Sequence, residues 1–209
     1  MINFKHYWED RHQQKGLQAV GNAKFSESDF FNNFDFLEEK FTPILEKYLV
    51  NKKVLDFGCG WGRWSRVLNL FCDIYGTDLS AEAITQLHRL KSDLGLNSAN
   101  FLTYNEKIPF EIKFTGIFCW TVLQHIPPLE LMKIVEELNG VSDEKCTLVL
   151  FENTSNLPSK EHIFFHPVSY YEKIFEEFQL LYSEIFQKID GENDLEIHSL
   201  MIFEKKLRT

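Results

Sequence analysis

The residues best placed to do chemistry are three glycines, Gly58, Gly60 and Gly62, with the spacing G-x-G-x-G. They follow the apolar run 54–57, so we expect the chain to leave a buried strand, turn tightly and enter a helix near residue 63. Glycines in such a turn let the backbone approach a ligand closely, just before a helix N-terminus. The pattern therefore predicts a ligand site at the end of this strand.

Two side chains beside the glycines indicate which ligand the turn favours. A dinucleotide-binding turn has the spacing G-x-G-x-x-G, and its third glycine would fall where this chain has Arg63. Asp56 lies two residues before the first glycine, and its carboxylate would repel a pyrophosphate. It suits a ligand that carries an ammonium group and no phosphate. The sequence thus points away from NAD and toward S-adenosylmethionine (SAM).

The segment from Asp56 to Gly62 resembles the first motif of the class I SAM-dependent methyltransferases, D-x-G-C-G-x-G after a strand. A second signal of that family is an acidic residue at the end of the next strand, where this chain has Asp78. In the family this acid accepts hydrogen bonds from both ribose hydroxyls, which suits two carboxylate oxygens. Alternatively, Asp78 only precedes a helix cap at Ser80. The resemblance spans roughly residues 50–209 and implies SAM as cofactor and S-adenosylhomocysteine (SAH) as product.

The resemblance implies further cofactor contacts and departs from the family at one position. Asn105 and Glu106 are both candidates to meet the adenine amino group, and we favour Asn105 because its side-chain carbonyl could accept from it. Family members often have Phe-Asp where this chain has Phe114-Thr115, which hardly changes the cofactor prediction. The predicted cofactor contacts are Asp56, Gly58, Cys59, Gly60, Gly62, Asp78, Leu79, Asn105, Cys119 and Trp120.

His125 is the candidate general base. It follows the carboxyl end of the predicted strand 116–120, where open α/β sheets bind their ligands. Methyl transfer to a hydroxyl needs a group that takes up a proton, and histidine is the commonest such group near neutral pH. A structural role, in which His125 only anchors the loop before Pro127, fits the sequence equally well, and both readings stay open.

Candidates for binding the methyl acceptor come from three segments. Glu152 and Asn153 lie at the end of the fifth predicted strand. The resemblance implies that the segment 161–171 also contributes to the acceptor pocket. The aromatic and basic N-terminal segment could fold over the pocket as a lid. For each residue alone, simple packing is the alternative. These candidates are Tyr7, Trp8, Arg11, Glu152, Asn153, His162, His166 and Tyr170.

The alternation of apolar and amphipathic segments after residue 50 predicts an α/β domain over residues 51–209. Apolar strand candidates alternate with helices, and the last two strands flank Asp190-Gly191 without a helix between them. We therefore predict a Rossmann-like, doubly wound sheet of seven mostly parallel strands with an antiparallel C-terminal hairpin. The expected strands are 54–57, 74–77, 100–103, 116–120, 147–151, 180–188 and 196–205, and the helices 63–71, 80–94, 128–140 and 168–178.

Residues 1–50 contain no strand-like run and are predicted to form a helical N-terminal cap or lid of the same domain. A polar stretch over 16–28 predicts a loop. Phe30, Phe34, Leu37 and Phe41 then recur on one helical face. Thr42-Pro43 has the pattern of a capping residue followed by proline, which predicts that a new helix begins there.

Composition excludes several classes of protein. The 209 residues include 31 acidic and 22 basic ones, a formal charge of −9 without any basic cluster, so we expect neither nucleic acid nor a membrane as a partner. No run approaches the length of a membrane span, and no targeting signal opens the sequence. Four isolated cysteines favour a reducing cytoplasm, and the excess of Lys over Arg favours an AT-rich, bacterial genome. No spacing of His, Asp or Glu predicts a metal site.

These patterns predict an enzyme that transfers a methyl group from SAM to a small-molecule acceptor. We expect O-methylation of a polar metabolite or glycan precursor, with an aromatic acceptor such as a quinone precursor as the other option. A protein or peptide methyltransferase, or a SAM-binding protein without turnover, are the alternatives. The oligomeric state stays open.

Overall fold

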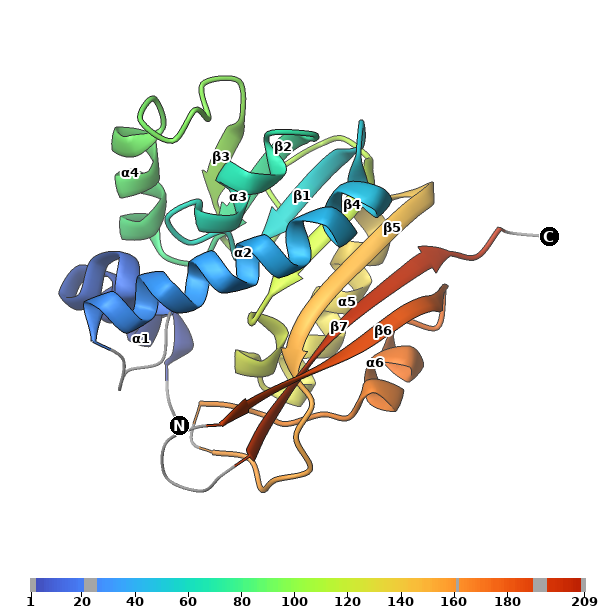
Figure 1. The fold of residues 1–209 in the computed structure, drawn as a ribbon. Helices are drawn as coiled ribbons and strands as arrows, with labels where there is room; N and C mark the ends of the chain where they lie inside the picture. The colour runs from blue at the N-terminus through green and yellow to red at the C-terminus, as the bar shows by residue number, and fades with distance from the viewer. Residues whose placement is uncertain (1–2, 21–25, 161, 190–194, 208–209) are drawn as a thin grey trace. The chain divides into compact units, whose positions relative to one another are not determined.

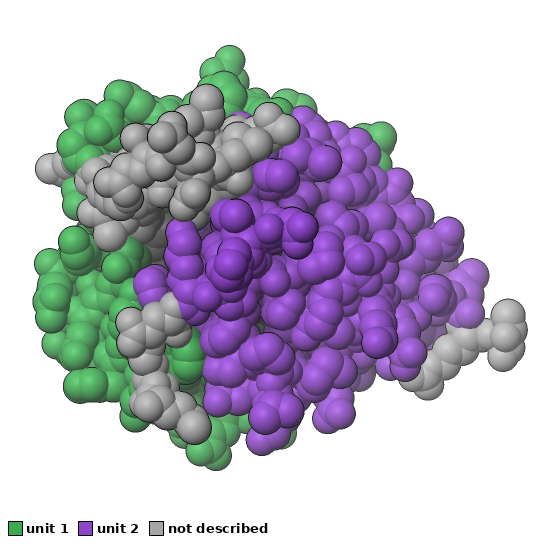
Figure 2. Space-filling view, turned by 90° about the horizontal axis from the view of Figure 1, so that it is seen from below, with its two compact units in different colours: residues 1–110 green, residues 111–209 purple. Residues whose placement is uncertain are grey.

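The computed structural model describes residues 3–20, 26–160, 162–189 and 195–207. The chain divides into two compact units, Met1–Phe110 and Glu111–Thr209, coloured separately in Figure 2. The predicted turn at Asp190-Gly191 and the side chain of Phe30 lie outside what is described. The predicted division into a cap before residue 51 and a methyltransferase domain after it stays a prediction.

The first unit combines three parallel strands with helices (Figure 1). Its strands β1 (Lys53–Phe57), β2 (Asp73–Asp78) and β3 (Asn100–Thr103) pair in the order β3-β2-β1. Because β1 and β2 are parallel and in register, the glycine turn that follows β1 lies next to the end of β2. Its helices are α1 (Phe4–Lys15), the 3₁₀ helix η1 (Gly16–Val20), α2 (Glu27–Leu49), α3 (Arg63–Leu68) and α4 (Ala81–Leu90).

The helices of the N-terminal segment correct two predictions. The predicted helix start at Thr42-Pro43 is wrong, because α2 runs through Pro43 without a break. Thr42 is inside the helix, where its hydroxyl donates to the carbonyl of Glu38 at 2.6 Å instead of capping a new one. Pro43 faces solvent, and the buried stripe on the opposite face continues on both sides of it, which offsets the roughly 3 kcal/mol that an interior proline costs. The predicted loop at 16–28 is also wrong at both ends, because Gly16–Val20 forms η1 and residues 27–28 already belong to α2.

The second unit contains the remaining described strands. β4 (Phe114–Trp120) and β5 (Ser142–Asn153) are parallel, whereas β7 (Leu195–Lys205) runs antiparallel to β5 and to β6 (Phe178–Ile189). The order is β4-β5-β7-β6, and Figure 1 shows β6 and β7 as a long hairpin. This unit also holds η2 (Leu123–His125), α5 (Pro128–Val141) and α6 (Val168–Ile174). The seven described strands therefore confirm the predicted mostly parallel set and the antiparallel C-terminal hairpin.

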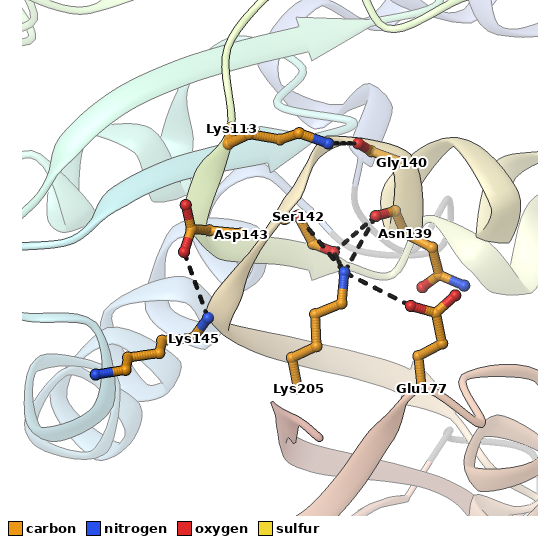
Figure 3. A network of polar contacts seen from close by, with 8 residues as sticks. All are labelled: Lys113, Asn139, Gly140, Ser142, Asp143, Lys145, Glu177 and Lys205. Carbon is orange, nitrogen blue, oxygen red and sulfur yellow. Dashed lines mark hydrogen bonds and ion pairs between the residues drawn. The ribbon is translucent and has the colours of Figure 1, made fainter. Parts of the chain in front are cut away.

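A lysine network closes the C-terminal end of α5 (Figure 3). The Lys205 ammonium donates to the Ser142 hydroxyl at 2.5 Å and to the Asn139 carbonyl at 3.3 Å, and lies 3.6 Å from the Glu177 carboxylate. Lys113 donates to the carbonyl of Gly140. The last carbonyls of a helix lack partners within the helix and carry partial negative charge, so both lysines stabilise this end.

Replacing Lys205 by Met should lower the free energy of unfolding by about 2 kcal/mol, because the side chain is only 10% exposed and its bonds are charge-assisted. The neighbouring Lys206→Met is the matched control and should change it by about 0.5 kcal/mol or less, since Lys206 makes an exposed bond to the Glu176 carbonyl. Urea denaturation followed by circular dichroism measures both. Equal losses in the two variants would contradict a structural role for the network.

Candidate functional site

The glycine turn after β1 has the backbone geometry that only glycine adopts readily. Gly58, Gly60 and Gly62 have φ values of 78°, 54° and 81°. The amides of Gly58 and Cys59 donate to the carbonyl of Thr77 at 2.8 and 3.0 Å, which ties the turn to the end of β2. A Cβ atom at Gly62 would lie 2.4 Å from Leu87 Cδ1 of α4. The turn therefore follows the predicted strand-to-helix path and packs closely against α4.

Asp78 connects this turn to the loop after β2. Its Oδ2 accepts the amide of Gly60 at 2.8 Å, and its Oδ1 accepts the amide of Ser80 at 2.9 Å. Burial raises the pKa of Asp78, whereas nearby His12 and the two amides oppose that shift. Each oxygen keeps a further lone pair, so the carboxylate retains the capacity to accept a ribose hydroxyl. Ser80 is the N-cap of α4, as the second interpretation of Asp78 requires.

The other predicted cofactor residues of the first unit differ in accessibility. Asp56 is buried, accepts the Ser65 hydroxyl at 2.5 Å, and has a pKa raised by burial to about 7. Cys59 is buried and Leu79 is half-buried. Asn105 is exposed, and its Oδ1 lies 3.5 Å from the Lys5 ammonium. Asp56 thus contacts α3 directly, and its predicted contact with an ammonium group stays a prediction.

The predicted lid residues lie on α1, where they contact one another. The Arg11 guanidinium lies 5.9 Å from the centre of the Trp8 ring and donates through Nε to the carbonyl of Ala19 at 2.5 Å. Tyr7 packs edge-to-face on Trp8 at 5.2 Å. Their predicted role toward an acceptor stays a prediction.

Sequence reasoning missed Lys5 and Glu9 of α1, and it placed His12 only within the predicted lid segment. Lys5, Glu9 and His12 are separated by four and three positions, the spacing of one helical face, and this spacing could have been noticed in the sequence. His12 is 2% exposed, and its Nδ1 accepts the indole N–H of Trp61 at 3.1 Å. Because burial lowers the pKa of His12, the neutral imidazole that this bond requires is favoured.

Cys119 and Trp120 end β4 in the second unit. Cys119 is fully buried, and the Trp120 ring stacks on Phe151 of β5 at 3.9 Å between centroids, tilted by 9°. Both strand ends therefore lie in a packed aromatic layer. The predicted contacts of Cys119 and Trp120 with the methionine part of the cofactor stay predictions.

Glu152 occupies the end of β5 and holds the backbone that follows β4. Its Oε1 accepts the amides of Val122 and Leu123 at 3.1 and 3.0 Å, and its Oε2 accepts that of Gln124 at 3.1 Å. Burial raises its pKa to about 8, and these three amides act in the opposite direction. Both oxygens are thus engaged with η2, which carries His125.

His125 is oriented by groups on both sides of its ring. Its Nδ1 lies 2.7 Å from the carbonyl of His162, which can only accept, so Nδ1 carries the hydrogen. In the neutral ring Nε2 is then the acceptor, 3.3 Å from the Gln124 side-chain nitrogen. Gln124 also accepts the Asn153 amide at 2.7 Å, while Asn153 Oδ1 accepts the Ser155 hydroxyl at 2.6 Å. Sequence reasoning missed Gln124, which has no distinctive spacing.

The remaining acceptor candidates, His162, His166 and Tyr170, pack against aromatic rings of the second unit. The His162 ring lies parallel to that of His125 at 6.0 Å, and the His166 ring stacks on Tyr170 at 3.9 Å. Burial lowers the pKa of His166. Tyr171, which lies at the end of the segment 161–171 predicted to contribute to the acceptor pocket, is fully buried. Burial together with the charge of Glu152 raises the pKa of its hydroxyl. Among the described residues, the Tyr171 hydroxyl and His166 Nε2 have no hydrogen-bond partner.

The described part of the chain has neither a metal-ligand cluster nor a membrane-spanning helix. No group of three or more His, Cys, Asp or Glu residues there could hold a metal ion. None of the described helices has the length and apolar character needed to cross a membrane.

Comparisons with known proteins match part of this chain to a known family. Residues 54–144 match a family described as a methyltransferase domain. A ubiquinone biosynthesis O-methyltransferase of Paraburkholderia phymatum is 35% identical over 96 residues, which are 43% of this chain and 39% of the relative. This chain thus matches well under half the length of that relative.

Solved structures match nearly the whole chain. Magnesium protoporphyrin IX methyltransferase from Synechocystis with bound SAH has a TM-score of 0.74 at 17% identity, covering 97% of this chain and 98% of that one. The PH0226 protein of Pyrococcus horikoshii has a TM-score of 0.71 at 18% identity, covering 94% and 99%. Likenesses at this level of identity concern the fold, and they confirm the predicted Rossmann-like class.

Glu152→Gln should reduce the dependence of stability on pH. A carboxyl whose pKa is raised from 4.5 to about 8 stabilises the fold most below pH 4.5, and this contribution is lost as pH rises through 8. The free energy of unfolding of the wild type should therefore fall relative to that of the variant between pH 5 and pH 8. Urea unfolding at several pH values measures this difference. Glu144→Gln, an exposed change on the same strand, should run parallel to the wild type, and a parallel Glu152→Gln profile would contradict the shift.

Proposed function

We propose that this chain, whose residues 54–144 carry a methyltransferase domain of the class I SAM-dependent type, transfers a methyl group from SAM to an oxygen of a small molecule. The observation that carries the proposal is the joint position of the glycine turn and the Asp78 carboxylate at neighbouring strand ends. The similarity to an O-methyltransferase and to a methyltransferase crystallised with SAH supports it.

The first unit offers the groups that an adenosine and a methionine part would need. The turn provides close backbone approach at Gly58 and Gly60, and Asp78 provides two acceptor oxygens next to it. The third glycine of the dinucleotide-binding pattern is absent, because Arg63 occupies that position. These features support SAM over a dinucleotide.

The tautomer of His125 supports a hydroxyl as the methyl acceptor, because it leaves one ring nitrogen able to take up a proton. With Nδ1–H held by the His162 carbonyl, Nε2 is a proton acceptor whose bond to the Gln124 amide is long enough, at 3.3 Å, for an acceptor hydroxyl to replace it. Attack of that hydroxyl on the SAM methyl carbon would form an O–C bond, break the S–C bond to release SAH, and pass the hydroxyl proton to Nε2. Glu152 and Gln124 then position the base through η2.

For the acceptor we propose a polar metabolite or glycan precursor. Polar groups of the second unit, among them His162, His166 and the Tyr171 hydroxyl, support this choice. The stacked His166–Tyr170 pair and the name of the ubiquinone-pathway relative favour an aromatic acceptor as the second candidate. The four cysteines are free thiols in the structure, which fits a reducing compartment such as the cytoplasm.

Isothermal titration should show SAH binding in the micromolar range and no binding of NAD. Asp78→Asn should weaken SAH about tenfold, because the amide lacks the charge and one of the two acceptor oxygens. Asp73→Asn on the same strand is the matched control, since Asp73 is exposed, and should bind as the wild type does. Binding of NAD without SAH would overturn the cofactor proposal.

His125→Ala should lower kcat by a factor of about 100 or more while SAH affinity is unchanged. Before kcat is measured, the acceptor class is identified by incubating the protein with methyl-labelled SAM and a panel of sugars, phosphorylated metabolites, phenols and peptides. His88→Gln controls for loss of a histidine elsewhere, because His88 lies on α4 and bonds the backbone carbonyl of Phe101. Unchanged turnover in His125→Ala would mean that His125 is an anchor. Labelling of peptides alone, or of nothing, would favour a protein methyltransferase or a SAM-binding protein.

A further inference from the structure

Helix α1 presents one row of polar side chains to three separate loops of the first unit. Lys5, Glu9 and His12 form this row, with the four- and three-residue spacing that places side chains on one face. The three loops follow β1, β2 and β3 in turn. Figure 1 shows α1 in dark blue next to α4. One helix thus contacts segments that lie up to 100 residues away along the chain.

The central contact is made by Glu9 at the start of α4. Its Oε2 accepts the Ser80 hydroxyl at 2.8 Å, and its Oε1 accepts the amide of Glu82 at 3.2 Å. A carboxylate at this position also interacts favourably with the partial positive charge of the helix N-terminus. Glu9 therefore binds the loop that begins with Asp78.

The two outer contacts reach the loops on either side. His12 accepts the indole N–H of Trp61 at 3.1 Å, within the glycine turn. Gly16, just after α1, lies against the same ring, because a Cβ atom there would be 3.5 Å from Trp61 Cη2. Lys5 reaches Asn105 after β3 at 3.5 Å.

We propose that α1 completes the cofactor site by tying these three loops together, with Glu9 and His12 as positioning residues. The inference rests on the proposed binding of SAM, because the same loops contain the predicted contacts Gly60, Asp78 and Asn105. A helix and a ligand that both bind one arrangement of the loops stabilise each other's binding, and this coupling is reciprocal. Binding of SAM therefore stabilises the contacts of α1 with the three loops, and these contacts in turn raise the affinity for SAM.

Removing Glu9 tests this coupling without removing the cap of α4. The Ser80 hydroxyl accepts the amide of Ala83 at 3.1 Å independently of Glu9, so α4 stays capped in Glu9→Ala. Asp10→Ala is the matched control on the same helix, because the ion pair that Asp10 makes among the described residues is with His6 one turn away, at 3.2 Å, in a largely exposed contact. Both changes leave alanine, the best helix former, in α1.

Titration calorimetry with SAH should show affinity reduced about fivefold or more in Glu9→Ala and unchanged in Asp10→Ala. Hydrogen exchange supplies the reciprocal measurement: saturating SAH should slow exchange of the amides of residues 4–15 in the wild type, and less so in Glu9→Ala. If α1 had only a structural role, Glu9→Ala would lower the stability of the protein but bind SAH with wild-type affinity, and SAH would not change hydrogen exchange in α1. That result would overturn the inference. Absence of SAH binding in the wild type would instead refute the proposed function itself.

Discussion

The carboxylate of Asp78 is the group on which the arrangement of the loops after β1 and β2 depends. It accepts the amides of Gly60 and Ser80, so one side chain fixes both the turn after β1 and the start of α4 after β2. A buried carboxylate is costly unless such bonds compensate for its lost hydration. The arrangement of the two loops and the ionisation of Asp78 are therefore coupled. Glu9 extends the same principle, because it binds the loop from the other side through Ser80 and Glu82.

The second unit uses a carboxylate in the same way at the end of β5. Glu152 accepts three consecutive amides of the segment that leads into His125, and Gln124 joins that segment to Asn153. Strand ends are where backbone amides lose their ladder partners, and side chains must replace them. Each unit thus holds a loop at the end of a strand through an acidic side chain that accepts backbone amides.

Much of the fold could be predicted because its signals are local. Apolar runs such as the one ending at Phe57 and the capping pattern at Ser80 were sufficient to place strands and helices. Pro43 misled the prediction because packing of a long apolar stripe, which depends on the rest of the fold, overrides a local helix stop. Likewise, the sequence could not show that the oxygens of Glu152 are engaged by backbone amides, or that Glu9 contacts α4, since both contacts join residues far apart in the chain.

Gly62 has a consequence for how glycine motifs are interpreted. Its φ of 81° and the 2.4 Å approach that a Cβ would make to Leu87 both arise inside the protein, without any ligand. A side chain at this position would strain the backbone and require the buried Leu87 side chain to shift, whatever the chain binds. Evolutionary loss of the ligand would therefore leave this glycine under selection, so its presence in a distant sequence reports the fold, and the identity of the ligand must be sought at Asp78 and its neighbours.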